Sequence, residues 1–249
     1  MKILIANPNT STGVTDRLVA SGRLVASAGT ELMPMTAPRG VPYIATRAEA
    51  AIGSAVMLEM LAEARGTFDA AVCAAFGDPG LGGARELFDF PIVGMAEAAM
   101  LVACTLGRSF SIVSFARALE PWFAEIVAWH GLSGRCTAIR MLDGKFTDIN
   151  AVADEMEQLL VDLANRTVAD DGADVVILAG APLAGLANRI RDRVPVPLVD
   201  GIQAAVTMAE GLVRLNPRKA TAGTYRRPGP KSSTGLSKAL ADVIGHEDT

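Results

Sequence analysis

Residues 91–99, PIVGMAEAA, form a short apolar run that leads directly into an alanine-rich segment, and residues 197–205, PLVDGIQAA, repeat this arrangement 106 residues later. The same offset places Ala75 over Ala181. Along the whole chain, short β-type runs alternate with longer helical stretches. This alternation is typical of parallel sheets that are covered by helices on both faces, so the sequence predicts an α/β fold.

The weak internal repeat indicates that one α/β unit occurs twice. We expect two pseudo-symmetric, doubly wound parallel-sheet domains, the first formed by residues 1–97 together with 207–249 and the second by residues 98–206. Ligands of such folds bind where the carboxyl ends of the strands meet. The repeat therefore predicts an inter-domain cleft floored by residues around 75 and 181.

The expected elements follow from apolar periodicity and turn residues. Strands are expected at 3–6, 68–75, 91–94, 111–115, 137–141, 174–179 and 196–199. Helices are expected from about Thr12, at 48–64, after Pro79 through Leu87, and at 96–106, 119–129, 149–169, 182–193, 202–215 and 236–244. The final segment, 216–249, lacks strand periodicity before its short helix, and we expect a solvated tail that packs on the first domain.

Composition narrows the class of partner. With 249 residues, 50% hydrophobic and 20% charged, the chain has the profile of a globular protein, which excludes global disorder and a coiled coil. Aromatic residues make up only 5%, and 23 Lys and Arg against 27 Asp and Glu give a net charge of −4. Both features argue against nucleic acid as a partner and favour a small-molecule substrate.

The sequence gives no signal for a membrane or for a metal. The longest run without Asp, Glu, Lys or Arg, 175–188, has 14 residues, whereas a membrane span needs about 20. The N-terminus has only four apolar residues before Asn7, so no signal peptide is expected. Three cysteines without CxxC spacing and two histidines do not form a metal-ligand pattern. We expect a reduced, cytoplasmic protein without metal.

The two strand ends are the candidate sites. Each leads into a helix N-terminus, where free backbone N–H groups and the positive end of the helix dipole can hold an anion or a developing oxyanion. The N–H groups expected to do so belong to Phe76 and Gly77 in the first half and to Gly180 and Ala181 in the second. This arrangement suits carboxylates and enolates.

Five stretches resemble the hydantoin racemase branch of the aspartate/glutamate/hydantoin racemase superfamily: ILIANPNTS, AAFGDPGLGGARE, FPIVGMAEAAM, VVILAGAPLAGL and VPVPLVDG. They span nearly the whole chain, and NPNTS followed by FGDPG is fairly specific. The resemblance implies two pseudo-symmetric α/β domains, no metal or organic cofactor, and frequent homo-oligomers. It also implies kinship with arylmalonate decarboxylases and maleate isomerases.

The resemblance also exposes a departure at the catalytic positions. Racemases of this family use two cysteines that flank the substrate, so that one thiolate removes the α-proton and the other thiol returns a proton on the opposite face. These positions match Ala75 and Ala181. A methyl group carries no acidic proton, so the two-thiol mechanism cannot operate. Either both thiols were replaced by engineering, or this is a natural subgroup with different chemistry; Pro182, which also departs from the pattern, favours the second explanation.

Other side chains are candidates for the missing chemistry. Asp78 and Glu97 are the carboxylates nearest to the turns and the candidate catalytic groups, although Asp78 could instead cap the helix that starts at Pro79, and Glu97 could serve a helix dipole or an ion pair. The expected substrate-binding residues lie at the strand ends and in one loop: Asn9, Tyr43, Ala75, Phe76, Gly77, Ser114, Phe115, Gly180, Ala181 and Pro182.

The sequence therefore predicts a cofactor-independent enzyme of the racemase family, an isomerase, that acts on a small cyclic amide or carboxylate through an enolate-like intermediate with non-standard acid and base groups. Two alternatives remain open. One is a lyase or decarboxylase on a small carboxylate, which needs a single proton delivery. The other is a member of the family that binds a metabolite without turnover. We further expect a homo-oligomer.

Overall fold

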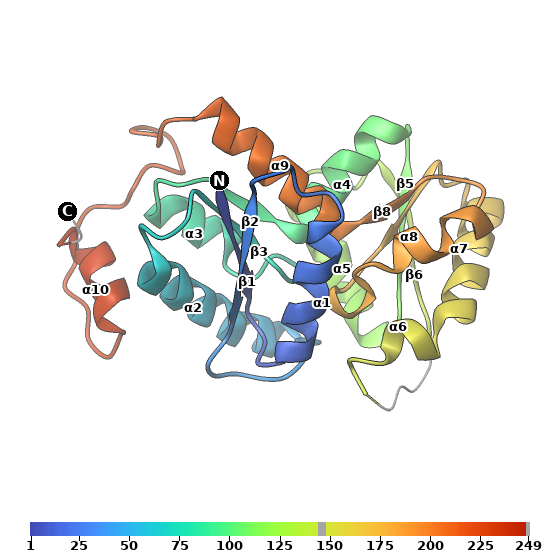
Figure 1. The fold of residues 1–249 in the computed structure, drawn as a ribbon, viewed down its shortest axis with the longest axis horizontal. Coiled ribbons are helices and arrows are strands. Elements are labelled where there is room, and N and C mark those ends of the chain that lie inside the picture. The colour runs from blue at the N-terminus through green and yellow to red at the C-terminus, as the bar shows by residue number, and fades with distance from the viewer. Residues whose placement is uncertain (144–147, 248–249) are drawn as a thin grey trace.

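The computed structural model describes residues 1–143 and 148–247, which fold into two similar halves (Figure 1). Each half is built on a four-stranded parallel sheet, with the order β2-β1-β3-β4 in the first and β6-β5-β7-β8 in the second. The strands are β1 (Lys2–Asn7), β2 (Glu31–Thr36), β3 (Ala70–Cys73), β4 (Ile92–Gly94), β5 (Phe110–Ser114), β6 (Cys136–Met141), β7 (Val175–Leu178) and β8 (Leu198–Asp200). The predicted pair of parallel-sheet α/β units is confirmed.

Helices cover both sheets. The first half contains α1 (Thr12–Arg23), α2 (Arg47–Ala64) and α3 (Leu81–Leu87), and the C-terminal α10 (Lys238–Gly245) packs against α2. The second half contains α5 (Glu120–Trp129), α6 (Val152–Glu155), α7 (Glu157–Asp171) and α8 (Leu186–Ile190), together with the short 3₁₀ turns η1 (Arg117–Leu119), η2 (Ala181–Leu183) and η3 (Arg191–Arg193). Two further helices, α4 (Met95–Leu106) and α9 (Gly201–Leu215), connect the halves.

Local sequence explains how these elements begin. The strands β3 and β7, AAVC and VVIL, are fully buried in central positions, as continuous apolar runs in parallel sheets are. Ser11 caps α1 by accepting a hydrogen bond from the N–H of Val14 at 3.3 Å. Thr46 and Glu49 form a capping box at the start of α2.

Each connecting helix packs against the sheet of the other half. The helix α4 follows β4 but packs against β7 and β8, whereas α9 follows β8 and packs against β3 and β4. The two helices also contact each other, and Figure 1 shows α9 and α4 side by side above the junction. One hydrophobic cluster includes buried side chains of both sheets and of both helices. The halves therefore share a core, which fixes their relative position.

The strand β2 was not expected from the sequence. Its residues, ELMPMT, include Pro34, which lacks a backbone N–H and weakens the strand signal. The structure places β2 at the edge of its sheet, paired only with β1 and with Pro34 opposite Ile5. An edge strand tolerates proline because one side of its backbone has no ladder to complete.

Two helix predictions are wrong in detail. The single helix expected at 149–169 is divided into α6 and α7, because the backbone leaves the helical region at Met156 (φ −111°, ψ 7°), whose side chain is buried in the core. The helix expected at 182–193 is divided into η2, α8 and η3, and Gly185 separates the first two in the left-handed region (φ 88°). Tertiary packing overrides helix propensity in the first case.

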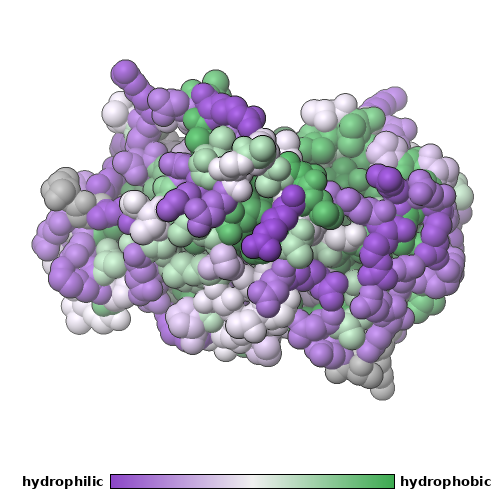
Figure 2. Space-filling view, viewed as in Figure 1, coloured by the Kyte–Doolittle hydropathy of each residue, from purple (hydrophilic) through white to green (hydrophobic). Residues whose placement is uncertain are grey.

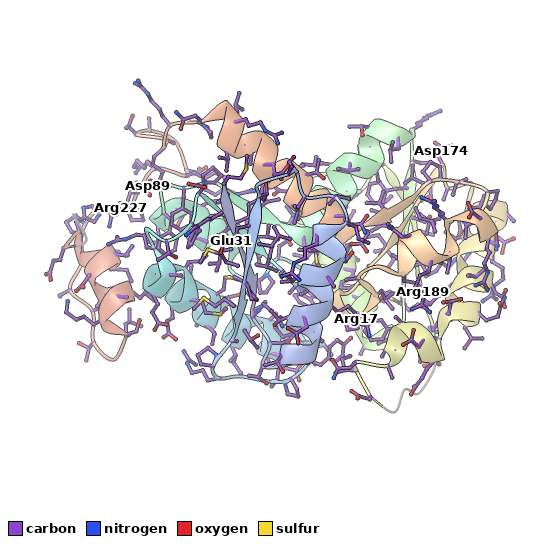
Figure 3. All side chains as sticks on the ribbon, in the orientation of Figure 1. Arg17, Glu31, Asp89, Asp174, Arg189 and Arg227 are labelled. Atoms are coloured by element: carbon purple, nitrogen blue, oxygen red, sulfur yellow. The ribbon has the colours of Figure 1, made fainter. Side chains whose placement is uncertain are left out.

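The C-terminal segment lies along the first half and ends in α10, at the far end of that half in Figure 1. Leu240 and Val243 of α10 are buried in a second apolar cluster, which they share with α2 and α3. The domain boundaries at 97/98 and 206/207 remain a prediction, and the predicted domains include residues 144–147 and 248–249, which lie outside the described residues. Among the described helices, none is both long enough and apolar enough to cross a bilayer. On the face seen in Figure 2, hydrophilic side chains predominate around apolar patches near the junction of the halves.

Candidate functional site

A pocket lies between the two halves, at the carboxyl ends of β3 and β7. Ala75 follows β3 by two residues and Ala181 follows β7 by three, and the two alanines line this pocket together. The cavity is small, about 30 Å³. Its walls come from both halves: Asn9, Tyr43, Ile44, Ala75, Phe76, Leu119, Trp122, Phe123, Gly180, Ala181 and Pro182.

Equivalent main-chain hydrogen bonds hold both turns to the central strands. The N–H of Ala74 donates to the carbonyl of Ala6, and the N–H of Ala179 donates to the carbonyl of Val113, both at 2.9 Å. Beyond these anchors, the described acceptors take no hydrogen bond from the N–H groups of Phe76, Gly77, Gly180 and Ala181. Gly77 and Gly180 have positive φ angles of 132° and 113°, which favour glycine. The turns therefore hold unused N–H donors next to the two alanines.

A buried carboxylate ties each turn to a helix N-terminus. Asp78 accepts hydrogen bonds from the N–H groups of Ala96 and Glu97 at 2.9 and 2.8 Å, at the start of α4. Asp200 accepts from Gly185 at 2.6 Å and also caps α9. Burial raises the pKa of both carboxyl groups, and the hydrogen bonds they accept partly offset this rise.

Asn9 contributes an oriented amide from the NPNTS motif. Its Oδ1 accepts hydrogen bonds from Nδ2 of Asn7 and from the N–H of Ser11, both at 3.0 Å. Asn7 is itself completely buried and also donates to Thr15 at 3.0 Å. Because the oxygen of Asn9 is occupied in this way, its Nδ2 is the group that Asn9 offers to the pocket as a hydrogen-bond donor.

Tyr43 and two residues at the end of β5 lie together. The ring of Tyr43 lines the pocket and packs against Phe115 with centroids 5.7 Å apart. Burial, together with the charge of Glu49, raises the pKa of Tyr43, so the phenol stays protonated at neutral pH. Phe115 and Ser114 do not line the pocket; the hydroxyl of Ser114 donates to the carbonyl of Ala179 at 2.7 Å and so supports the second turn from behind.

The structure thus brings seven of the ten expected substrate-binding residues to one pocket: Asn9, Tyr43, Ala75, Phe76, Gly180, Ala181 and Pro182. Gly77, Ser114 and Phe115 do not line it. The apolar wall formed by Ile44, Leu119, Trp122 and Phe123 was missed. These side chains read as core residues from the sequence, and only the position of α5 next to the first turn gives them another role.

The two candidate catalytic carboxylates do not line the pocket. Asp78 is 5% exposed and faces α4 and His130, whose Nε2 lies 3.4 Å from Oδ2. Glu97 forms an ion pair with Arg85, at 2.5 Å. The alternative that Asp78 caps the helix after Pro79 is wrong in its target, because the side chain reaches the N-terminus of α4. The helix α3 begins at Leu81, and its N-cap residue, Gly80, provides no side-chain cap.

The cysteines also lie elsewhere. Cys73 is buried at the end of β3, and burial and the charge of Asp78 raise the pKa of its thiol well above the ordinary range. Burial raises the pKa of Cys136 to about 11. No cysteine of the described chain lines the pocket, and its histidine, cysteine and acidic side chains form no cluster of three that could hold a metal. The polar groups that the described lining offers are the amide of Asn9, the phenol of Tyr43 and the main chain.

The comparison with protein families decides the relationship. The model of the family described as Asp/Glu/Hydantoin racemase matches residues 3–209. The chain belongs to this family. It is 31% identical to a hydantoin racemase of Paenarthrobacter aurescens over 233 residues, which cover 93% of this chain and 99% of the relative. It is also 31% identical to a hydantoin racemase of Rhizobium meliloti over 238 residues, covering 94% and 98%. The predicted membership of a racemase family, and hence of an isomerase family, is confirmed.

Solved structures share the fold of this chain. Allantoin racemase from Klebsiella pneumoniae superposes with a TM-score of 0.91 at 32% identity, covering 96% of this chain and 98% of that one. Arylmalonate decarboxylase, in a Gly74Cys-Cys188Ser mutant, superposes with a TM-score of 0.64 at 17% identity, covering 85% and 92%. The second likeness shows a shared fold alone.

Proposed function

We propose that this chain is a cofactor-independent enzyme of the racemase family that binds a small, neutral cyclic amide of the hydantoin type and stabilises an enolate-like state of it. One observation carries the proposal. The pocket presents hydrogen-bond donors, but none of the side chains that line it within the described residues is charged. Neutral carbonyl groups suit such a lining.

The donors match the oxygens of a cyclic diamide. Nδ2 of Asn9 and the unused N–H groups of Phe76 and Ala181 can donate hydrogen bonds to carbonyl oxygens of the ligand. The negative charge on these oxygens grows as the carbon–hydrogen bond breaks, so the donors stabilise the enolate-like state. A free carboxylate or a zwitterionic amino acid would leave water for this pocket without a countercharge, which is costly. The relatives named as hydantoin and allantoin racemases support the same substrate class.

Proton transfer differs from the two-thiol scheme, because Ala75 and Ala181 hold no exchangeable proton. Tyr43 supplies the one ionisable side chain in the described lining. Its raised pKa makes it a weak acid but keeps the phenol protonated at neutral pH, so a proton is present that can be returned to the strongly basic enolate-like carbon. The proton that leaves the substrate needs an acceptor, and the carboxylates of Asp78 and Glu97, which lie behind the pocket wall, remain the candidates for it.

A lyase or decarboxylase is the second candidate, and the apolar wall favours it. A carboxylate held against Phe76, Trp122 and Phe123 loses its hydration and is destabilised. Carbon dioxide, the leaving group, is neutral and needs no hydration, so the apolar wall favours its release. The resulting carbanion requires a single proton, which Tyr43 can deliver. This reaction uses the same enolate-stabilising donors but begins from a charged substrate.

One experiment separates these functions. Purified protein is incubated in deuterated buffer with enantiopure 5-substituted hydantoins and, separately, with substituted malonates. Deuteration at C5 with loss of optical rotation supports racemisation, a product of lower mass supports a lyase, and protection from thermal unfolding without turnover supports binding alone. Asn9→Ala removes the donor from the pocket and is expected to abolish the response to hydantoins, whereas Asn188→Ala, at an exposed asparagine outside the pocket, leaves it intact.

The proposal includes a small homo-oligomer in the cytoplasm. Two exposed leucines on α4, Leu101 and Leu106, are 41% and 52% accessible and give the connecting helix an apolar outer face. Sedimentation velocity measures the oligomeric state directly, and a purely monomeric species would contradict this part of the proposal.

A further inference from the structure

The pocket is too small for the ligand class that its donors suit. The volume of the pocket that is open to the centres of water molecules is about 30 Å³. One water needs at least about 10–15 Å³ by this measure, so the pocket holds about two waters. A five-membered diamide ring with its two carbonyl oxygens has seven heavy atoms before any substituent is added. Enclosure of such a ring between the two halves therefore requires that one wall of the pocket withdraws.

The two turns are poor candidates for that movement. Buried carboxylates and strand hydrogen bonds hold them, through Asp78 and Ala74 in the first half and through Asp200 and Ala179 in the second. The opposite wall starts at η1 and continues into α5, and its N-terminus, at Leu119, has no side-chain cap. This wall carries Trp122, the largest side chain in the pocket.

Trp122 lies directly on the first turn. A Cβ atom built on Gly77 would lie 2.3 Å from Cζ2 and 2.6 Å from Cη2 of the Trp122 ring, so the indole occupies the space above the glycine. Trp122 is 7% exposed, and its neighbour Phe123 packs on Phe76 with ring centroids 4.9 Å apart. The indole reaches from the second half across the pocket to the turn that carries Ala75.

We propose that Trp122 is the specificity-determining residue of this pocket: its indole fills the room next to the first turn and restricts the ligand to a ring with a small substituent. The inference rests on the proposed function for the identity of the ring. A ligand displaces the indole from Gly77, and a bulky substituent meets the indole in any position that α5 allows. Removing the indole therefore converts a pocket for small ligands into one for aromatic substituents.

The experiment compares affinities for 5-methylhydantoin and 5-benzylhydantoin by calorimetry. In Trp122→Ala, the affinity for the benzyl compound relative to the methyl compound is expected to rise by at least about tenfold. Trp122→Phe retains an aromatic wall and is expected to give an intermediate ratio, and it also serves if the alanine variant does not fold. The matched control is Trp129→Ala, because Trp129 lies on the same helix but is 53% exposed and outside the pocket.

Fluorescence gives a second readout that needs no turnover. The chain has only two tryptophans, so Trp129→Phe leaves Trp122 as the sole indole reporter. Displacement of its ring by 5-methylhydantoin is expected to shift the emission maximum and to change quenching by acrylamide. Unchanged emission at saturating ligand would overturn the displacement of the indole.

Two outcomes distinguish this inference from the proposed function. An unchanged benzyl-to-methyl ratio in both Trp122 variants, with hydantoin binding intact, overturns the inference and leaves the proposed function in place. The other outcome is that the Trp122 variants bind no hydantoin but change the affinity for phenylmalonate relative to methylmalonate. This result supports Trp122 as the residue that limits ligand size and overturns the cyclic amide as the ligand.

Discussion

The two turns that meet at the pocket are each held by one buried aspartate, but the two aspartates lie on different elements. In the first half, Asp78 lies in the turn itself and reaches the helix after β4, whereas in the second half Asp200 lies at the end of β8 and reaches back to the turn. The repeat offset places Ala184 opposite Asp78 and Gly94 opposite Asp200. A Cβ on Gly94 would lie 2.4 Å from Oδ2 of Asp78, so the small residue leaves room for the carboxylate. One architecture is thus held together by two different sequences.

The surroundings of the two carboxylates differ in charge. Asp78 is next to His130, and Glu97 with its partner Arg85 completes an ionisable cluster behind the first turn. Asp200 has the hydroxyl of Ser21 as its side-chain partner, at 3.2 Å, and no charged one. The first turn is therefore held next to a cluster of ionisable side chains, and the second is held by uncharged donors.

The largest effect is expected from returning thiols to both turns. In Ala75→Cys/Ala181→Cys, the unused N–H groups beside each sulfur favour the thiolate, so the thiol pKa values should fall below the free value of about 8.5. The double variant should racemise a hydantoin about 10²–10⁴-fold faster than the parent chain, which measures general acid–base catalysis by the pair. Polarimetry and C5 deuteration are the measurements.

The single variants Ala75→Cys and Ala181→Cys are the controls, because inversion needs a proton carrier on each face. The contradicting outcome is a double variant that folds, binds a hydantoin and reacts with iodoacetamide near neutral pH, yet exchanges no proton. It would show that two reactive thiols at these turns are not enough for racemisation in this pocket.

The next largest effect is expected from replacing Asp200, the carboxylate that accepts more hydrogen bonds. Asp200→Ala removes the acceptor of four donors, the N–H groups of Gly185, Ile202 and Gln203 and the hydroxyl of Ser21. Asp78→Ala affects two main-chain donors and the contact with His130. The free energy of unfolding should fall by about 3 kcal/mol for Asp200→Ala. The loss for Asp78→Ala should be smaller, and urea denaturation at pH 7 measures both. A larger loss of unfolding free energy for Asp78→Ala would show that the ionisable cluster around Asp78 stabilises the fold more than the donors around Asp200 do.

The connecting helices also differ at a matching position. On α9, Glu210 is 3% exposed and accepts hydrogen bonds from the N–H and hydroxyl of Ser27 and from Thr30, at 2.5–2.8 Å. The repeat offset places Cys104 at this position of α4. Burial alone would raise the pKa of Glu210, but the hydrogen bonds from Ser27 and Thr30 lower it from 4.5 to about 2.

A carboxyl group whose pKa is lower in the folded protein stabilises it above the unfolded pKa and ceases to do so as the pH falls through the folded value. Glu210→Gln should therefore cost about 2 kcal/mol of unfolding free energy at pH 7, a difference that shrinks between pH 4.5 and about 2. Urea titrations at pH 7 and pH 3 measure this, with Glu63→Gln, at an exposed site on α2, as control. A difference that does not depend on pH would mean that shape, not charge, matters at this position.

The sequence was sufficient for the parts of the fold that local pattern controls. The apolar runs at β3 and β7, the offset between the halves and the NPNTS and FGDPG motifs predicted both the sheets and the placement of Ala75 and Ala181 at one pocket. It was not sufficient where tertiary contacts decide. Pro34 hid an edge strand, a core contact at Met156 divided a helix, and Trp122 gained its place from the packing of α5 on Gly77.

The smallest effect is expected at the surface link between the halves. Arg47, at the start of α2, donates to Glu125 on α5 with distances of 2.5–3.0 Å, but their side chains are 61% and 54% exposed. Water and salt screen such a pair, and the buried faces of the helices α4 and α9 already join the halves. Arg47→Ala should leave the urea midpoint unchanged at high salt and almost unchanged at low salt. A loss comparable to that of Asp200→Ala, or a second unfolding transition, would mean that the halves depend on their exposed contact more than on the core they share.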